Sequence, residues 1–486
     1  MASLALQSPA AQNISIGSKL HGESRLLAEI MAQTIEQHTD YSVTRRYGLG
    51  GTLICFEALR TGEIDIYPEY TGTVLTAILH IDAIGLSEKE VAQKMTVRLN
   101  EKYGMSVGPS LGFNNTYVLA ARPELGLQKI SDLRGRSDLT LGFSNEFIER
   151  ADGFAGLNLH YKLGLEKPRG IDHGLAYMAL QEKQIDLTDA YSTDGKLSTY
   201  AFQLLEDDQN FFPPYYAVPL IAKNAEMQYP QLEAALAKLA NVLDEKTMQA
   251  LNYRYEVDKI PLAEVAFQFL FEKGIVDKKA GKLTSSPLLR QLLEHIQLTF
   301  LATFLAILFA LPLAFYISDK KRVSAFFLSI TSVVQTIPSL ALLGFMIPLF
   351  GIGFTPAIIA LFLYAILPIL RNTVTGLNAT DPLLIEAGRA MGMTKSQLLL
   401  QLRLPLAMEM IMAGIRTALT INIGTATLAA FIGAGGLGES IITGITLNDN
   451  ALILRGAIPA ALLALVADQG MALLEKAVRP QGIDRN

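Results

Sequence analysis

The 486 residues give room for about three domains, and half of them are hydrophobic while only 18% are charged. A net charge of −5 excludes the strongly basic surface typical of nucleic-acid-binding proteins. The single cysteine, Cys55, excludes an intrachain disulfide and a cysteine-based metal cluster, and we expect it to be a small buried residue. No cofactor is expected.

Residues 1–12 are interpreted as a leader remnant or a disordered segment. They lack the basic start and the full apolar core of an export signal, so we expect a processed or engineered start.

Residues 13–280 have the composition of a soluble α/β domain, in which short β-rich runs alternate with amphipathic windows. Strands are predicted at 14–19, 41–46, 64–67, 117–121 and 139–143, and helices at 23–38 and 50–60. Such alternation predicts parallel sheets with helices on both faces. The length suits two lobes around a cleft, with lobe one at about 13–107 plus 217–280 and lobe two at about 117–212.

A polar linker at 281–290 precedes a half, 291–478, that is dominated by long charge-poor runs. A membrane-spanning helix needs about 20 predominantly apolar residues. Five candidates are predicted, at 293–317, 324–350, 354–371, 407–431 and 454–475. The prolines inside the second and third are tolerated where neighbouring protein or water satisfies the freed backbone groups, which favours helices packed around a pathway over a simple anchor.

Lysine and arginine in the short connections predict the orientation of these spans. They occur between the first two spans, around the third connection and in the tail at 479–486, but not near 350–354 or 432–453. The C-terminus and the loop at 372–405 are therefore expected in the cytoplasm, and residues 1–290 outside it.

That basic loop carries Glu386-Ala387-Gly388 and Gly392, followed by Leu404-Pro405, close to the pattern E-A-A-x3-G-x9-I-x-L-P. In this position it resembles the coupling loop, here 386–405, of bacterial ABC importer permeases. The resemblance implies a separate ATPase, expected in two copies, and a second copy of this chain. The chain itself has no G-x-x-x-x-G-K-[ST] with which to cradle ATP phosphates. The coupling residues expected by resemblance are Glu386, Ala387, Gly388, Gly392, Leu404 and Pro405.

Two other motifs are matched without their structural context. The stretch 433–438 satisfies G-x-G-x-x-G, but it ends an apolar run instead of following a strand, so we interpret it as a tight external turn or re-entrant bend. The stretch 108–112 satisfies G-x-S-x-G, but a β-like run follows it where a nucleophile elbow needs a helix. We interpret it as a crossing between lobes, and a membrane-anchored hydrolase is disfavoured.

Several short motifs in the soluble half resemble those of substrate-binding proteins from quaternary-amine (osmoprotectant) ABC importers. The matching stretches begin at Ile16, Gly48, Asp65, Asn114, Asp189 and Pro213. The resemblance implies a two-lobed periplasmic-binding-protein fold followed by an all-α polytopic transmembrane domain. It also implies a box of tyrosines around a trimethylammonium head and polar residues on a ligand carboxylate. By motif position the box maps onto Tyr70, Tyr117, Tyr191 and Tyr215, and the carboxylate ligands onto Lys19, Thr73 and Arg150.

The chemistry is consistent with this resemblance. A quaternary ammonium has no N–H to donate and is attracted by aromatic faces, whereas a lysine and an arginine would favour betaine-type zwitterions over choline. Two alternatives stay open: a membrane-anchored sensor that does not transport, and import of choline, carnitine or ergothioneine. Arg150 could instead form an ion pair within the run 149–152.

Overall fold

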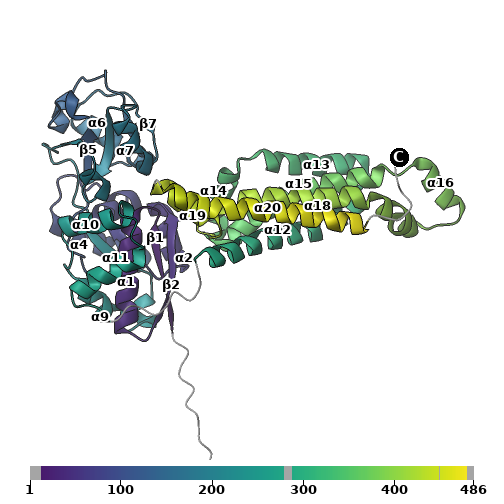
Figure 1. The fold of residues 1–486 in the computed structure, drawn as a ribbon, viewed down its shortest axis with the longest axis horizontal. Coiled ribbons are helices and arrows are strands. Elements are labelled where there is room, and N and C mark those ends of the chain that lie inside the picture. The colour runs from purple at the N-terminus through teal and green to yellow at the C-terminus, as the bar shows by residue number, and fades with distance from the viewer. Residues whose placement is uncertain (1–11, 278–286, 448, 479–486) are drawn as a thin grey trace, which may run out of the picture. The chain divides into compact units, whose positions relative to one another are not determined.

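The computed structural model describes residues 12–277, 287–447 and 449–478 (Figure 1). The expected leader remnant, most of the linker and the tail lie outside the described residues. Contacts divide the chain into two compact units. The first is Met1–Lys282 with Thr443–Asp449, and the second is Leu283–Ile442 with Asn450–Asn486.

Lobe one of the first unit is built on a five-stranded sheet in the order β2-β1-β3-β10-β4. Its strands are β1 (Asn13–Lys19), β2 (Ser42–Gly50), β3 (Ile66–Tyr70), β4 (Ser106–Val107) and β10 (Ala217–Ile221). The helices of this lobe are α1 (Gly22–His38), α2 (Thr52–Thr61), α3 (Thr71–Thr73), α4 (Glu88–Tyr103), α8 (Ala225–Gln228), α9 (Leu232–Leu236), α10 (Glu245–Glu256) and α11 (Leu262–Glu272), with a π-turn η1 (Val74–Ile78) and a 3-10 turn η5 (Ala237–Leu239). The apolar residues that recur at helical spacing along α1 are all buried, namely Leu26, Leu27, Ile30, Met31 and Ile35.

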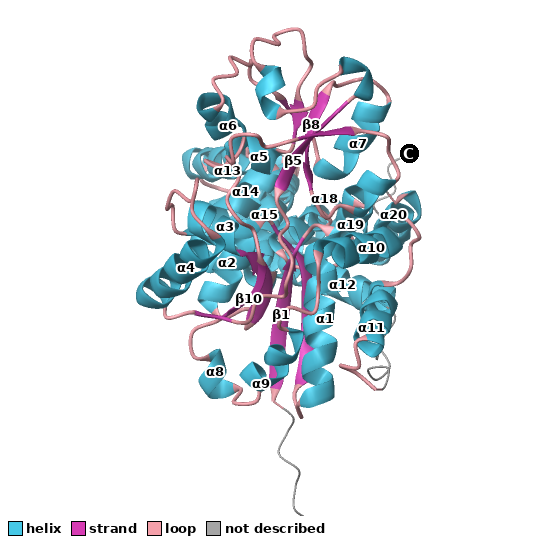
Figure 2. Cartoon of the chain, turned by 90° about the vertical axis from the view of Figure 1, so that its left-hand side faces the viewer, coloured by secondary structure: helices cyan, strands magenta, loops and turns pink. Residues whose placement is uncertain are grey.

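Lobe two is smaller and holds a three-stranded sheet in the order β8-β5-β9 (Figure 2). These strands are β5 (Tyr117–Ala121), β8 (Leu187–Tyr191) and β9 (Gln203–Leu205), and a short pair is formed by β6 (Gly142–Phe143) and β7 (Arg169–Gly170). The helices are α5 (Asn145–Glu149), α6 (Phe154–His160) and α7 (His173–Gln181), with 3-10 turns η2 (Pro123–Leu125), η3 (Ile130–Leu133) and η4 (Gly195–Ser198).

The expectation of parallel sheets is only partly correct. β1 pairs in parallel with β2 and β3, but β10 runs antiparallel to both β3 and β4. In lobe two, β5 is antiparallel to both of its neighbours. A parallel pair needs a crossover connection, usually a helix, between its strands. Both β5 and β10 instead follow directly on segments that pass between the lobes, so they pair antiparallel.

The second unit is helical. Its elements are α12 (Pro287–Ile317), α13 (Lys321–Thr336), α14 (Ser339–Phe350), α15 (Phe354–Asn378), α16 (Pro382–Ala390), α17 (Lys395–Gln397), η6 (Leu398–Arg403), α18 (Leu404–Ala426), η7 (Leu428–Ile432), α19 (Gly438–Thr446) and α20 (Asn450–Val478). Residues 443–446 of α19 are grouped with the first unit. Among the described residues, four helices are long and apolar enough to cross a membrane. α13 and α14, bent by 98° at their junction, bring the number to five if they form one span.

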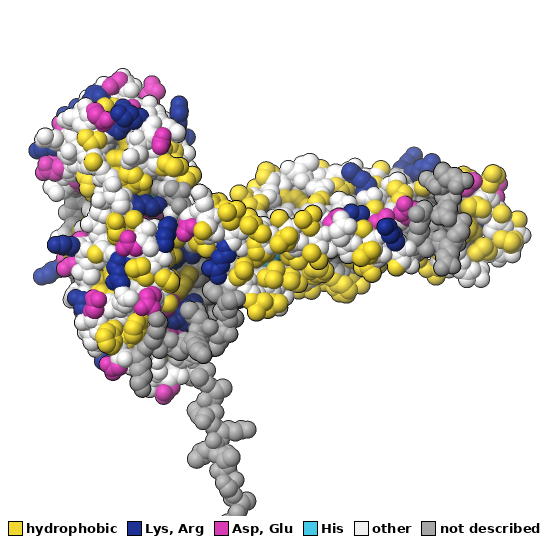
Figure 3. Space-filling model, viewed as in Figure 1, with side chains coloured by type: hydrophobic (Ala, Val, Ile, Leu, Met, Phe, Trp, Pro, Cys, Tyr) yellow, Lys and Arg dark blue, Asp and Glu magenta, His cyan; other side chains and the backbone are white. Residues whose placement is uncertain are grey.

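The core of this unit depends on small side chains. Ala302, Ala306, Ala310 and Ala314 lie at every fourth position of α12 and are completely buried. They share one face of the helix and pack with buried residues of α15 and α18. Small residues let transmembrane helices approach closely, while large apolar side chains cover much of the visible surface of these helices (Figure 3).

Candidate functional site

A cavity in the first unit brings residues of both lobes together. It is lined by Lys19, His21, Tyr70, Thr73, Asn115, Tyr117, Glu146, Tyr191 and Tyr215. All four tyrosines of the predicted box therefore line one cavity, together with Lys19 and Thr73. Arg150 is not among the lining residues.

Strand ends and strand register position the tyrosine rings. Tyr70 is the last residue of β3, and Tyr117 lies directly opposite Tyr191 in the antiparallel pair β5–β8. The ring centroids of Tyr117 and Tyr191 are 5.1 Å apart, and those of Tyr117 and Tyr215 are 5.7 Å apart with planes at 86°. Gly72 makes room for Tyr215, because a Cβ at Gly72 would come within 2.7 Å of that ring.

The hydroxyl groups of two of these tyrosines are held by buried carboxylates. Tyr70 donates to Glu23 at 2.5 Å, and Tyr215 donates to Asp152 at 2.6 Å. A tyrosine whose polar tip is fixed in this way keeps a defined ring orientation. The arrangement can present π-faces to a cation that offers no hydrogen-bond donor.

His21 is a cavity residue that the sequence analysis did not select. It is the N-cap of α1, where its Nδ1 accepts the N–H of Ser24 at 3.3 Å. Its ring centroid lies 6.4 Å from that of Tyr70 and 6.0 Å from that of Tyr191. Burial, assisted by the nearby Lys19 ammonium, lowers the pKa of His21 to about 3, so the imidazole is neutral near pH 7. Its position just after the end of β1 was the feature of the sequence that could have identified it as a cavity residue.

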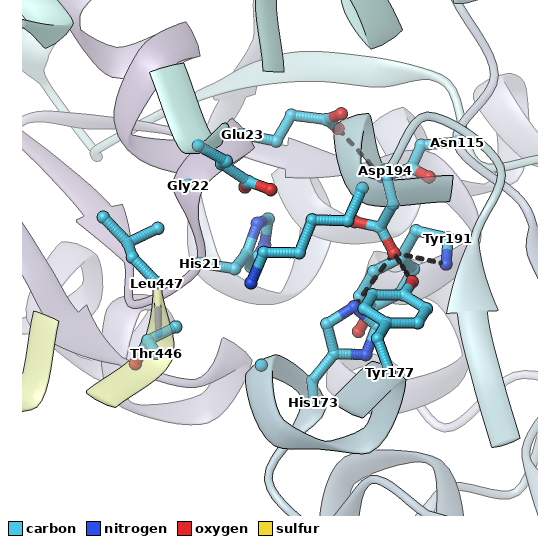
Figure 4. Close-up of a pocket in the computed structure, with 13 residues that line it drawn as sticks. His21, Gly22, Glu23, Asn115, His173, Tyr177, Tyr191, Asp194, Thr446 and Leu447 are labelled. Atoms are coloured by element: carbon cyan, nitrogen blue, oxygen red, sulfur yellow. Dashed lines mark hydrogen bonds and ion pairs between the residues drawn. The ribbon is translucent and has the colours of Figure 1, made fainter. Parts of the chain in front are cut away.

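A second group of polar side chains, His173, Tyr177 and Asp194, lies next to Tyr191 (Figure 4). Asp194 accepts the backbone N–H of Tyr191 at 2.9 Å, contacts His173 Nε2 at 2.9 Å and accepts a hydrogen bond from Tyr177. Burial alone would lower the pKa of His173, but Asp194 outweighs it and raises that pKa to about 9. The His173 ring, 4.8 Å from that of Tyr191, is therefore positively charged near pH 7.

Lys19 ends β1 and faces the cavity, but it already has an anionic partner. Its ammonium forms an ion pair with Glu69, a completely buried residue, and lies 5.1 Å from the centroid of the Tyr70 ring. Glu69 also accepts the backbone N–H of Tyr70 at 2.9 Å. Burial raises the pKa of Glu69, and the Lys19 ammonium opposes that rise.

Arg150 lies behind the cavity wall. Its guanidinium donates two hydrogen bonds to Asp152, at 2.8 and 2.5 Å, and its central carbon lies 5.7 Å from the ring centroid of Tyr117. The ion pair left open by the sequence analysis is therefore present, although it is buried. Its predicted contact with a ligand carboxylate stays a prediction, because that carboxylate would have to compete with Asp152.

The two lobes are hydrogen-bonded to each other near the cavity. Glu23 of α1 accepts from Thr193 of lobe two at 2.5 Å and also accepts from Asn115 at 2.8 Å and Asn252 at 2.7 Å. Elsewhere, Thr76 of lobe one donates to Asp152 of lobe two at 2.9 Å. These hydrogen bonds hold the two lobes together beside the cavity.

In the second unit, the predicted coupling residues lie on the short helix α16, in the turn after it and at the start of the long helix α18. Glu386, Ala387 and Gly388 belong to α16, Gly392 takes a left-handed φ of 83° in the turn, and Leu404 and Pro405 begin α18. Gly388 is buried, and a Cβ there would come within 2.7 Å of Leu398 in η6. Nearby, Leu383 and Met391 leave 70% and 76% of their surface exposed, an apolar surface of the kind that partners cover.

Comparison with known proteins assigns a family to each half. Residues 12–272 match the family described as the substrate binding domain of ABC-type glycine betaine transport systems. Residues 302–480 match the family of binding-protein-dependent transport system inner membrane components.

Individual relatives of the second half are permeases. The choline transport system permease protein OpuBB of Bacillus subtilis is 44% identical over 198 residues, which are 41% of this chain and 91% of that protein. The carnitine transport permease protein OpuCB of Listeria monocytogenes is 46% identical over 196 residues, 40% of this chain and 90% of that protein. A solved glycine betaine/carnitine/choline ABC transporter is 29% identical, and its alignment covers 54% of this chain and 100% of that chain with a TM-score of 0.47.

Proposed function

Because the chain belongs to the ABC-type glycine betaine transport family, with substrate-binding and permease domains fused in one polypeptide, we propose that it captures a betaine-like quaternary ammonium compound outside the cell and forms its pathway across the membrane. The boundaries proposed for the two functional parts are 13–280 and 291–478. As in other permeases of ABC importers, ATP hydrolysis belongs to a separate subunit.

The observation that carries this proposal is the cavity lined by four tyrosines from both lobes. Each aromatic face contributes about 0.5–2 kcal/mol to the binding of a cation, so four faces give roughly 2–8 kcal/mol. Micromolar affinity requires about −8 kcal/mol before the costs of association are counted. The binding energy from the rings alone is therefore barely enough for micromolar affinity. Lys19 and Thr73 are proposed to hold a ligand carboxylate and to supply the rest of the binding energy.

The names of the relatives support a trimethylammonium group as the recognised feature. They include permeases for choline, carnitine and glycine betaine, which share that group and differ in the rest of the molecule. Choline, carnitine and ergothioneine therefore remain alternative substrates. A sensor that does not transport is disfavoured, because the second half matches permeases and has up to five spans in its described part.

Helix ends support the proposed orientation. Arg403, the last residue of η6, donates to Asp319 at 2.7 Å, to Asn378 at 3.2 Å and to the carbonyl of Leu377 at 3.2 Å, which joins the basic connections at one end of the helices. Gly353 donates to the carbonyl of Ile432 at 2.7 Å, which joins two connections without lysine or arginine. The basic end is proposed to be cytoplasmic, with the binding domain on the opposite side of the membrane.

The coupling segment 386–405 is proposed to contact the ATPase at that basic end. Two copies of this chain and two ATPase subunits are proposed to form the transporter, with one pathway between the permease halves. The exposed Leu383 and Met391 support this docking role.

Uptake and binding experiments test the proposal. The chain, purified with the ATPase subunit that accompanies it and placed in proteoliposomes, should accumulate radiolabelled glycine betaine only when ATP is supplied on the coupling-loop side. Glycine betaine should also stimulate ATP hydrolysis. A panel of glycine betaine, proline betaine, carnitine, choline and ergothioneine, measured by calorimetry, would rank the ligands. Failure of every quaternary amine to bind would refute the proposal.

A further inference from the structure

The charged side chains around the cavity differ in how closely they are paired with a side chain of opposite charge. Lys19 and Glu146 are the lysine and the carboxylate among the lining residues. Lys19 forms an ion pair with Glu69, and the nearby Arg150 is held by two hydrogen bonds to Asp152. Both cations are therefore largely balanced by carboxylates that do not line the cavity.

Glu146 has weaker partners. Its Oε1 accepts from Thr52 at 3.3 Å and from Arg150 at 3.4 Å, which is much longer than the 2.5 Å between Arg150 and Asp152. Its side chain keeps 36% of its surface exposed, against 5% for that of Lys19. A ligand in the cavity can therefore reach the Glu146 carboxylate more readily than the Lys19 ammonium.

The carboxylate is also ionised. Burial would raise the pKa of Glu146, but the positive charges of Lys19 and Arg150 outweigh burial and bring that pKa below its usual value. With Lys19 and Arg150 paired to Glu69 and Asp152, Glu146 is a lining carboxylate whose cationic partner, Arg150, is no closer than 3.4 Å.

From this balance we infer that Glu146 is the counter-ion of the bound quaternary nitrogen and a specificity-determining residue that admits cations without a carboxylate, choline being the simplest. The inference rests on the proposed function and deepens it. The head group has no N–H, so the attraction acts through space and requires charge, not a hydrogen bond. A choline-like cation experiences that attraction alone, whereas the carboxylate of glycine betaine is repelled by Glu146 and offsets part of the gain.

The test is Glu146→Gln, which keeps the shape of the side chain and an oxygen for Thr52 but removes the charge. With the full chain in lipid nanodiscs and equilibrium dialysis of radiolabelled ligands, the Kd of choline should rise about tenfold. The Kd of glycine betaine should change less than about threefold, because its two charges respond in opposite directions. The control is Glu149→Gln, an exposed carboxylate on the same helix, which should change neither Kd.

Glu146→Asp keeps the charge and should preserve the ratio of the two dissociation constants. If circular dichroism shows that Glu146→Gln is unfolded, Glu146→Ala takes its place in the same comparison. Equal losses for both ligands, or an unchanged Kd for choline, would overturn the inference while leaving the proposed function intact. Absence of binding of either ligand to the unmodified chain would instead overturn the proposed function.

Discussion

At the scale of single residues, the aromatic faces of Tyr117 and Tyr191 should carry measurable binding energy. Removing one ring by Tyr117→Ala or Tyr191→Ala should raise the Kd of glycine betaine about 2- to 30-fold, the range given by 0.5–2 kcal/mol for each face. Tyr117→Phe keeps the ring and should stay within about threefold of the unmodified chain. Calorimetry that finds the same affinity in Tyr117→Ala and Tyr117→Phe would remove Tyr117 from the proposed box.

Lys19 should distinguish ligands by their carboxylate. Lys19→Ala should weaken glycine betaine more than choline, since only the former offers an anion to the ammonium. The substitution also leaves the buried Glu69 without its ion-pair partner, which is destabilising. The double variant Lys19→Ala/Glu69→Gln removes that unpaired charge and serves as the control. Equal weakening of the two ligands in the double variant would contradict a contact between Lys19 and a carboxylate.

The residues that the sequence could place are those whose position follows from a strand end or a matched motif. Lys19, Tyr70, Tyr117 and Tyr191 are such residues, and the structure brings them to one cavity. Ionic pairing could not be predicted in the same way. The partners of Lys19 and Arg150 are Glu69 and Asp152, and which carboxylate a buried cation meets depends on how strands and loops pack. Glu146 was missed for the same reason, whereas His21 was missed although it lies just after the end of β1.

At the scale of elements, the sequence pattern located β1, β2, β3, β5 and the short β6, but it missed the other strands and carried no information on strand direction. The predicted strand at 117–121 coincides with β5, yet β5 pairs antiparallel with β8 and β9. A buried strand has similar apolar content in either direction, and only the connection before it determines how it can pair. The second predicted span was also found as two helices with a 98° bend, next to Pro338, which cannot continue the hydrogen bonding of a helix.

The contact between α16 and η6 gives a prediction for coupling. Gly388→Val should push Leu398 away, because even a Cβ at this position comes within 2.7 Å of that side chain. We expect binding of glycine betaine to be unchanged and ligand-stimulated ATP hydrolysis to fall severalfold, since the displaced helix is proposed to contact the ATPase. Ala390→Val places a valine at an exposed position of the same helix, α16, and is the control. If glycine betaine still stimulates ATP hydrolysis fully in the Gly388→Val chain, the contact between α16 and η6 is not needed for coupling.

At the scale of the whole molecule, the proposed transport mechanism couples ligand capture to closure of the two lobes. Glu23 is placed to link them, because one carboxylate accepts hydrogen bonds from the ring-bearing Tyr70 of lobe one and from Thr193 of lobe two. Asn115 and Asn252 add two further donors. Loss of an acceptor here should therefore change the orientation of a cavity ring and the population of the closed state at once.

Glu23→Gln tests this link, because it replaces one acceptor oxygen by an NH2 group that must face existing donors. An unmatched buried donor costs about 1–3 kcal/mol. If that cost falls on the closed state, the apparent Kd of glycine betaine rises in proportion to the lost population, by about 5- to 150-fold at these energies. Small-angle scattering and amide hydrogen exchange should show a more open binding domain without ligand, whereas the exposed control Glu101→Gln should behave like the unmodified chain. A Glu23→Gln chain with normal affinity and normal exchange would mean that closure is held elsewhere, for example by the hydrogen bonds from Thr76 to Asp152 and from Thr52 to Glu146.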